Sequence, residues 1–254
     1  SHLRYGAKRR KWRWRFILPL LRHTYATADG VVAVSRGVAD DLCSLTGLPP
    51  RLVTPLYNPV VDSELIAKAK SSIDHPWFKP GAPPVILGMG RLSEEKDFAT
   101  LIRTFARVKT RLPARLMIFG EGEMRRKLQA LACELGVDQD VSLPGFTGNP
   151  FAYMARAAVF VLSSLHEGLP GVLIQALACG CPVVSTNCPG GAAEILEDGR
   201  YGRLVPVGDP AAMAQAIIST LDAPPDRELL QKRASLFSVD RAVEQYLDVL
   251  FARK

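Results

Sequence analysis

From residue 83 onward the chain alternates between short apolar runs and helical patterns, and this alternation limits the fold more than any other feature. Apolar runs typical of buried parallel strands lie at 83–90, 114–122, 140–146, 157–164, 181–186 and 202–207. Helical patterns separate them at 96–113, 123–136, 150–157, 171–180 and 209–222. This order predicts an α/β fold with a doubly wound parallel sheet. Such sheets bind ligands at the carboxyl ends of their strands, so functional residues should directly follow strands.

The first part of the chain is organised differently. Residues 28–42 predict a strand and then a helix capped by Ser35, and residues 51–65 predict a second strand with a turn at Asn58-Pro59. Residues 67–84 are polar and rich in Pro and Gly, which indicates a connector. We therefore divide the chain into residues 1–57 and 58–254. The first segment is too short for a domain, and we expect it to be the end of a larger one.

Positive charge is concentrated at the N-terminus. The net charge is +7, but eight Lys and Arg residues lie between Arg4 and Arg22 without any acid. The rest of the chain contains 24 basic and 25 acidic residues and is therefore nearly neutral. A uniformly basic nucleic-acid-binding domain is therefore excluded, and we expect no nucleic-acid partner. Together with Trp12, Trp14 and Phe16, the segment suits either an anionic membrane surface or a helix whose aromatic side chains pack in a core. We favour packing.

Membrane spans, secretion signals and metal sites are not predicted. The sequence has neither an apolar window of membrane length nor a signal peptide, so we expect a cytoplasmic protein, with peripheral contact at the inner face of the membrane as the alternative. The five cysteines are odd in number and no histidine cluster accompanies them. Reduced thiols in a cytosolic protein are the simplest interpretation.

The loop after the run 83–90 carries two cations. Arg91 follows Gly90 directly, and Lys96 is expected at the start of the next helix. Cations beside the free N–H groups of a helix N-terminus form an anion site, where Arg offers a planar fork and Lys a point charge. The alternative is a pair of solvated charges beside Glu94 and Glu95.

The segment 166–184 is the strongest single signal. Glu167 lies in the loop between a strand and a helix, and Pro170 suits the first helical turn. The amides of Gly171 and Val172 are then free to bind phosphate. A carboxylate beside an anion site indicates hydrogen bonds from ligand hydroxyls to Glu167, and Gln175 on the helix could face the same crevice. Alternatively, Glu167 only complements the helix dipole and Gln175 only fills the surface.

Five segments in series, 90–102, 116–128, 141–146, 166–196 and 202–217, resemble the nucleotide-sugar-binding C-terminal half of retaining family 4 glycosyltransferases. The resemblance runs from about Ala28 to the C-terminus in the order and spacing of that family. It implies a GT-B fold, in which two Rossmann-like domains face each other across a cleft. Residues 58–254 would be the donor-binding domain, and residues 1–57 the remnant of the acceptor domain.

The resemblance also implies a role for each matching position. Arg91 and Lys96 correspond to the basic pair that holds the donor diphosphate and stabilises the leaving phosphate, and Glu167 to the glutamate that contacts donor-sugar hydroxyls. Donor-binding positions are implied at Gly90, Phe146, Thr147, Gly168, Leu169, Pro170, Gly171, Val172 and Gln175. Phe146 and Thr147 lie where the nucleobase is held, and Gln175 replaces a glutamate that binds the ribose.

The implied reaction is retaining, metal-independent sugar transfer from a nucleotide-diphosphate sugar to a hydroxyl of a glycan or lipid-linked acceptor, as in polysaccharide biosynthesis. No cofactor and no metal ligand are expected. Two departures from the family leave an alternative open. Gln175 lacks the glutamate charge, and most of an acceptor domain is missing from the sequence. The alternative is a degenerate, non-catalytic module that binds a nucleotide or a partner protein.

Overall fold

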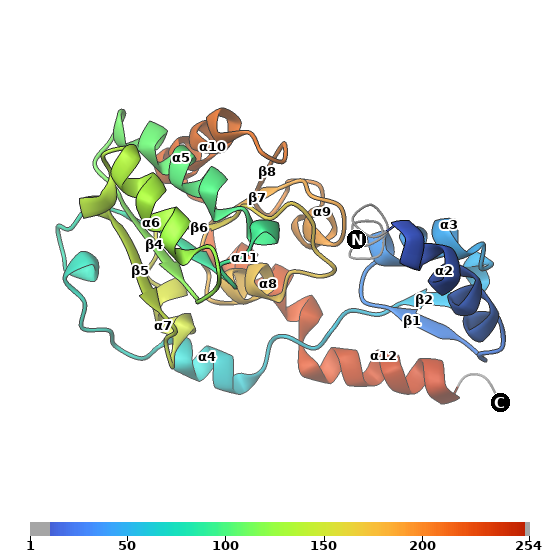
Figure 1. The fold of residues 1–254 in the computed structure, drawn as a ribbon. Coiled ribbons are helices and arrows are strands. Elements are labelled where there is room, and N and C mark those ends of the chain that lie inside the picture. Colours follow the sequence, from blue (N-terminus) through green and yellow to red (C-terminus); the bar gives the residue numbers. More distant parts are fainter. Residues whose placement is uncertain (1–10, 252–254) are drawn as a thin grey trace.

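A computed structural model describes residues 11–251, without the side chains of residues 11–16, 18 and 26. Its larger part is one parallel sheet in the order β5-β4-β3-β6-β7-β8 (Figure 1). The strands are β3 (Val85–Met89), β4 (Arg115–Phe119), β5 (Val141–Gly145), β6 (Val159–Leu162), β7 (Val183–Thr186) and β8 (Arg203–Val205). The chain winds outward from β3 to β5, returns to pair β6 with β3, and then winds the other way. The doubly wound α/β prediction is therefore confirmed.

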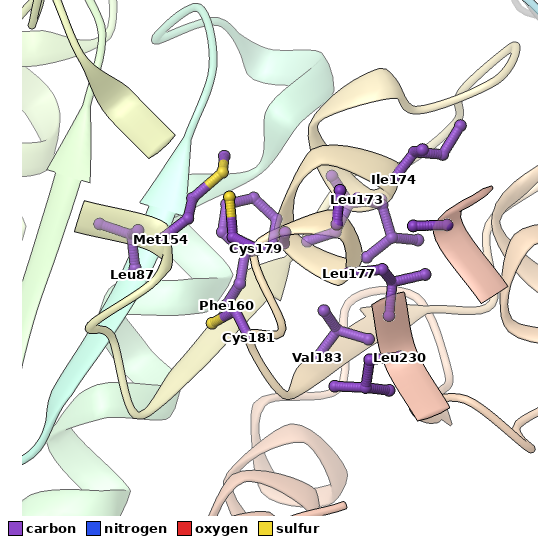
Figure 2. Close-up of a cluster of buried hydrophobic side chains, with 14 of the residues drawn as sticks. Leu87, Met154, Phe160, Leu173, Ile174, Leu177, Cys179, Cys181, Val183 and Leu230 are labelled. Carbon is purple, nitrogen blue, oxygen red and sulfur yellow. The ribbon is translucent and has the colours of Figure 1, made fainter. Parts of the chain in front are cut away.

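Successive residues of each central strand enter different cores, because strand side chains alternate between the two faces of a sheet. Leu87, Met117 and Phe160 lie in one buried cluster, whereas their neighbours Ile86 and Leu116 lie in the other. Figure 2 shows part of the first cluster, where Leu87 and Phe160 meet Met154 and Leu177 from flanking helices. Burial on both faces explains why these strands are continuously apolar.

Helices cover both faces of the sheet. Against one face lie α5 (Phe98–Lys109), α6 (Arg125–Glu134) and α10 (Pro210–Asp222). Against the other lie α7 (Pro150–Met154), α8 (Gly171–Ala178), α9 (Ala192–Leu196) and α11 (Arg227–Ala234). α12 (Val239–Phe251) follows, and in Figure 1 it extends away from the large sheet.

The N-terminal part contains α2 (Lys11–Ala26), β1 (Val31–Ala33), α3 (Arg36–Thr46) and β2 (Val53–Pro55). β1 and β2 form a separate parallel sheet with a small core of its own. Ser35 caps α3 as predicted, since its side chain accepts a hydrogen bond from Val38 N. The basic and aromatic segment between Arg4 and Arg22, for which packing was favoured over membrane contact, begins outside the described residues, and the side chains of Trp12, Trp14 and Phe16 lie outside them as well.

The connector is less irregular than predicted. α4 (Ser63–Ala69) extends into it, and a 3₁₀ turn forms at Pro76–Phe78. α4 forms because Asp62 caps it by accepting from Leu65 N and because Leu65 is buried in the core. Asn149 at the start of α7 donates to the carbonyl of Lys68 at 2.9 Å, which fixes α4 on the domain. Among the helices of residues 11–251, none is both long and apolar enough to cross a bilayer.

Candidate active site

The candidate site lies where the order of the large sheet reverses, between β3 and β6. At such a point two neighbouring loops leave the sheet in different directions and open a crevice. One loop follows β3 and contains Arg91 and the 3₁₀ turn Glu94–Lys96, and the other follows β6 and leads to α8. The amide of Leu165 donates to the carbonyl of Glu95 at 2.9 Å, so the two loops are in direct contact.

The structure brings Lys96 and Glu167 together. The ammonium nitrogen Nζ of Lys96 lies 2.5 Å from Oε1 of Glu167, and the two side chains are 25% and 10% exposed. Ser164 Oγ donates to the same carboxylate oxygen at 2.7 Å. Lys96 is not in the first turn of α5 as predicted, because Asp97 separates them as the helix cap. The sequence analysis did not predict this ion pair, because the two residues lie in separate loops.

A buried set of hydroxyl groups supports this ion pair, and the sequence analysis did not identify it. Ser163 Oγ donates to the main-chain carbonyl of Lys96, and Thr186 Oγ1 on β7 donates to the carbonyl of Ser164, both at 2.7 Å. Ser163, Ser164 and Thr186 are at most 1% exposed. The feature of the sequence that could have indicated this hydroxyl set is the pair of serines, Ser163 and Ser164, at the end of an apolar strand.

Arg91 lies in the same loop as Lys96 and is exposed to solvent. Gly90, just before it, is packed along the Lys96 side chain: a Cβ there would be 3.4 Å from Lys96 Cε. The guanidinium group is therefore on the solvent side of a loop whose other cation is partly buried. An exposed guanidinium group can form charge-assisted hydrogen bonds to an anion.

The loop 167–170 is held from two sides. The Gly168 carbonyl accepts from Gly191 N at 2.8 Å and from Ser35 Oγ at 3.1 Å, so the N-terminal part contacts the site directly. Gly190 has φ +123°, and a Cβ there would overlap the carbonyl oxygen of Glu167. Only glycine permits this approach. Leu169 packs beside Gly191.

The loop leads into α8, which begins at Gly171 after Pro170. Gly171 and Val172 are half-buried and supply the first main-chain amides of the helix. Gln175 is half-buried one turn further along, and its main-chain carbonyl accepts from Cys179 N. The amides therefore lie on the helix that directly follows Glu167, as the sequence predicted, and Gln175 lies on the same helix.

Phe146 and Thr147 follow β5 at the edge of the sheet. The ring of Phe146 is 83% exposed and could stack with a planar ligand. Thr147 Oγ1 instead accepts from Asn149 N at 3.3 Å and belongs to the turn that starts α7. Gly120, directly after β4, packs against the carbonyl oxygen of Gly90.

A second polar cluster joins the N-terminal part to α9. Glu194 accepts from the main-chain N of Arg36 at 2.9 Å and from the Tyr57 hydroxyl at 2.7 Å. Burial and the hydrogen bond to Glu194 raise the pKa of Tyr57 to about 12. This cluster was not predicted either.

The thiols and acidic groups do not form a metal centre. All five cysteines are free, and burial raises the pKa of Cys179 to about 12, so that this thiol is unreactive. Within residues 11–251, no group of three or more His, Cys, Asp or Glu side chains could hold a metal ion. A groove of about 650 Å³ between α5 and α10 is lined by residues such as Arg103, Arg107 and Ile218, none of which belongs to the predicted site.

Known glycosyltransferases are similar to this chain in sequence and in fold. The chain is 36% identical over 220 residues to the N-acetylgalactosamine-N,N'-diacetylbacillosaminyl-diphospho-undecaprenol 4-alpha-N-acetylgalactosaminyltransferase of Campylobacter jejuni, covering 87% of this chain and 57% of that protein. It is 31% identical to the lipopolysaccharide core biosynthesis glycosyltransferase LpsE of Rhizobium meliloti, covering 90% and 66% of the two chains. The crystal structure of Anabaena HepE in complex with UDP superposes with a TM-score of 0.77 at 24% identity, covering 89% and 64%.

The chain therefore spans about three fifths of the length of these three proteins. Residues 1–64 match the family described as Glycosyltransferase Family 4, and residues 83–223, more than half of the chain, match the family described as Glycosyl transferases group 1. The chain therefore belongs to the group 1 glycosyltransferases.

Proposed function

We propose that the protein containing this chain transfers a sugar from a nucleotide-diphosphate sugar to a hydroxyl of a glycan or lipid-linked acceptor. The observation that carries this proposal is the Lys96–Glu167 pair at the sheet reversal, beside the N-terminus of α8. The pair supports the proposal because it joins a cation to a carboxylate in the loop that leads to the first amides of α8. UDP is the first nucleotide to test, because a structural neighbour was solved with UDP.

In this proposal, Arg91, Lys96 and the amides of Gly171 and Val172 hold the diphosphate. As the bond between the anomeric carbon and the phosphate oxygen breaks, negative charge grows on that oxygen, and the two cations stabilise it. Glu167 accepts hydrogen bonds from the sugar. The acceptor oxygen bonds to the anomeric carbon on the face that the diphosphate leaves, and its proton passes to the released diphosphate. The configuration is thereby retained.

We also propose that the reaction requires no metal ion, because Arg91 and Lys96 can supply the positive charge that a divalent cation supplies elsewhere. Phe146 and Thr147 are proposed to contact the nucleobase, Gln175 the ribose, and Gly90, Gly168, Leu169 and Pro170 to shape the loops around the donor. The division of the chain at residues 57 and 58 belongs to the same proposal, and it is supported by the two separate sheets.

The test is to incubate the protein with UDP, GDP and ADP sugars and an undecaprenyl-linked glycan acceptor, and to measure the nucleoside diphosphate released, with and without EDTA. We expect release from one nucleotide class, insensitivity to EDTA, and at least a 100-fold loss in Arg91→Ala and Lys96→Ala. Arg111→Ala, an exposed arginine after α5, is the control. NMR of the product gives the anomeric configuration. Inversion of that configuration, or loss of activity with EDTA, would overturn the corresponding part of the proposal.

The second candidate is a non-catalytic module that binds a nucleotide or a partner protein, and Gln175 is the observation that favours it. An amide cannot replace the charge of a carboxylate toward ribose hydroxyls. Nucleotide binding without turnover of any sugar would support the module. Contact of the basic segment near the N-terminus with the inner face of the membrane, in a cytoplasmic protein, is a further proposal, tested by sedimentation with anionic vesicles.

A further inference from the structure

The Glu167 carboxylate is held through one of its two oxygens. In the part of the chain that the structure describes, Lys96 Nζ at 2.5 Å and Ser164 Oγ at 2.7 Å both donate to Oε1. Two donors that converge on one oxygen restrict rotation of the carboxylate about its last side-chain bond. The second oxygen, Oε2, then keeps its lone pairs for a ligand.

The two donors differ in how firmly they are themselves placed. Lys96 reaches Glu167 through a flexible stem of four methylene groups, whereas the Ser164 hydroxyl is one bond from the Cβ of a residue with 0% exposure. Ser164 is the second residue after β6, and its carbonyl accepts from Thr186 Oγ1 on β7 at 2.7 Å. The Ser164 hydroxyl is therefore attached to the sheet itself, and of the two donors it gives the carboxylate the more fixed reference point.

Its neighbour Ser163 has a different partner. Ser163 Oγ donates to the carbonyl of Lys96 at 2.7 Å and so fixes the main chain that carries the cation. Ser163 thus holds Lys96 through its main-chain carbonyl, and Ser164 holds Glu167 through its carboxylate.

We propose that Ser164 is a positioning residue that orients Glu167 so that Oε2 faces the donor sugar. This inference rests on the proposed function, in which Glu167 binds the sugar. When the Ser164 hydroxyl is removed, Lys96 remains as the donor to Oε1. The carboxylate can then rotate as the flexible lysine side chain moves. Recognition of the sugar is lost, whereas the diphosphate contacts of Arg91, Gly171 and Val172 are unchanged.

The test compares Ser164→Ala and Ser164→Cys with the unmodified protein. Cysteine keeps the approximate volume of serine but is only a weak hydrogen-bond donor. The control is Thr104→Val, which removes a buried hydroxyl from α5 that has no hydrogen-bond partner among the described residues. For each protein, calorimetry gives the Kd of UDP, and UDP release gives kcat and KM for a panel of UDP-sugars. Urea unfolding shows whether each variant is folded.

We expect both Ser164 variants to bind UDP within about threefold of the unmodified protein and to lose about 10- to 100-fold in kcat/KM, as for a lost hydrogen bond to a charged group. Discrimination between UDP-sugars should fall as well, which a purely structural role would not cause. Ser164→Cys decides the outcome if Ser164→Ala does not fold.

Two results would overturn the inference. Turnover and sugar discrimination equal to those of Thr104→Val would show that Ser164 does not position Glu167. Parallel losses of UDP binding and turnover would assign Ser164 a structural role. Failure of the proposed function is a separate outcome: the unmodified protein itself would then turn over no nucleotide sugar, and both proposals would be rejected.

Discussion

The hydroxyl of Tyr57 donates to Oε1 of Glu194 at 2.7 Å, across 137 residues of sequence. Tyr57 follows β2 at the end of the N-terminal part, and Glu194 lies on α9, beside the candidate site. The same carboxylate accepts from the main-chain N of Arg36 at the start of α3. Glu194 therefore joins the start of α3 and the residue Tyr57 after β2 to the large domain, and it fixes how the N-terminal part contacts the loop of Glu167.

The first prediction concerns this contact. Tyr57→Phe should lower the free energy of unfolding by about 1 kcal/mol at neutral pH, because a hydrogen bond to a carboxylate is lost. Folding raises the pKa of Tyr57 from 10.0 to about 12, so the folded state favours the protonated phenol. The contribution is complete below pH 10 and is lost as the pH rises toward 12. The difference between parent and variant should therefore shrink in alkali.

Urea unfolding of both proteins at neutral pH and at about pH 11 measures this difference. Tyr201→Phe is the matched control, because the Tyr201 ring keeps its contact with the Arg233 guanidinium, 5.2 Å away, when the hydroxyl is removed. A constant difference between parent and Tyr57→Phe across this pH range would contradict the assignment.

The second prediction separates the stabilising role of the Lys96–Glu167 pair from its role in activity. Lys96→Met leaves a largely buried carboxylate without its cation and should cost about 1–3 kcal/mol of unfolding free energy. Adding Glu167→Gln should recover part of this loss, with a coupling energy of about 1 kcal/mol or more in a double-mutant cycle. Both the single and the double variant should be inactive.

An exposed ion pair provides the control. Lys68 and Glu64 lie 2.7 Å apart on α4, with side chains 42% and 70% exposed. Solvent screens such a pair, so Lys68→Met should change the unfolding free energy by less than about 0.5 kcal/mol. Equal costs at the two sites would mean that burial of Glu167 has no energetic effect.

The sequence predicted the sheet because strands and helices are encoded by local periodicity. It also indicated the edge of the sheet where a candidate site should lie, because ligands bind where parallel strands end. It did not predict which side chains meet there. Lys96 and Glu167 are 71 residues apart, and Ser164 and Thr186 are 22 apart. Their contacts depend on β6 pairing with β3 on one side and β7 on the other, which no local pattern specifies.

The same reasoning explains why the ion pair between Lys96 and Glu167 was not predicted. The two charges lie in separate loops, and their contact becomes visible only when the strand order is known. The irregular connector was predicted for a related reason. Leu65 and Ile66 directly precede the predicted connector, and only the burial of Leu65 against the core shows that α4 is part of the domain.

The third prediction concerns Arg91, which is exposed and should act on the ligand rather than on the fold. Arg91→Ala should weaken UDP binding by about tenfold, because a charge-assisted bond to phosphate is lost, and should leave the unfolding free energy within about 0.5 kcal/mol. Salt screens exposed charges, so the affinity of the parent should depend more strongly on ionic strength than that of the variant. Calorimetric titrations with UDP at low and high salt test both statements, and Arg103→Ala on the outer side of α5 is the control.

The last prediction restores a charge. Gln175 lies on α8, one turn after the amides proposed to bind phosphate, and its amide oxygen is a neutral acceptor. Gln175→Glu supplies a carboxylate that can accept from two ribose hydroxyls. A gain of about 1 kcal/mol corresponds to about fivefold tighter UDP binding. The gain should vanish for a uridine diphosphate that lacks both ribose hydroxyls.

This comparison distinguishes ribose recognition from a general effect of charge. Gln129→Glu, on the exposed side of α6, adds the same charge away from the site and should leave both affinities unchanged. A new carboxylate that repels the diphosphate would instead weaken both ligands equally, and Gln175 would then not contact the ribose. Tighter UDP binding together with faster sugar transfer would show that the glutamine limits an active enzyme, whereas tighter binding without turnover would favour the non-catalytic module.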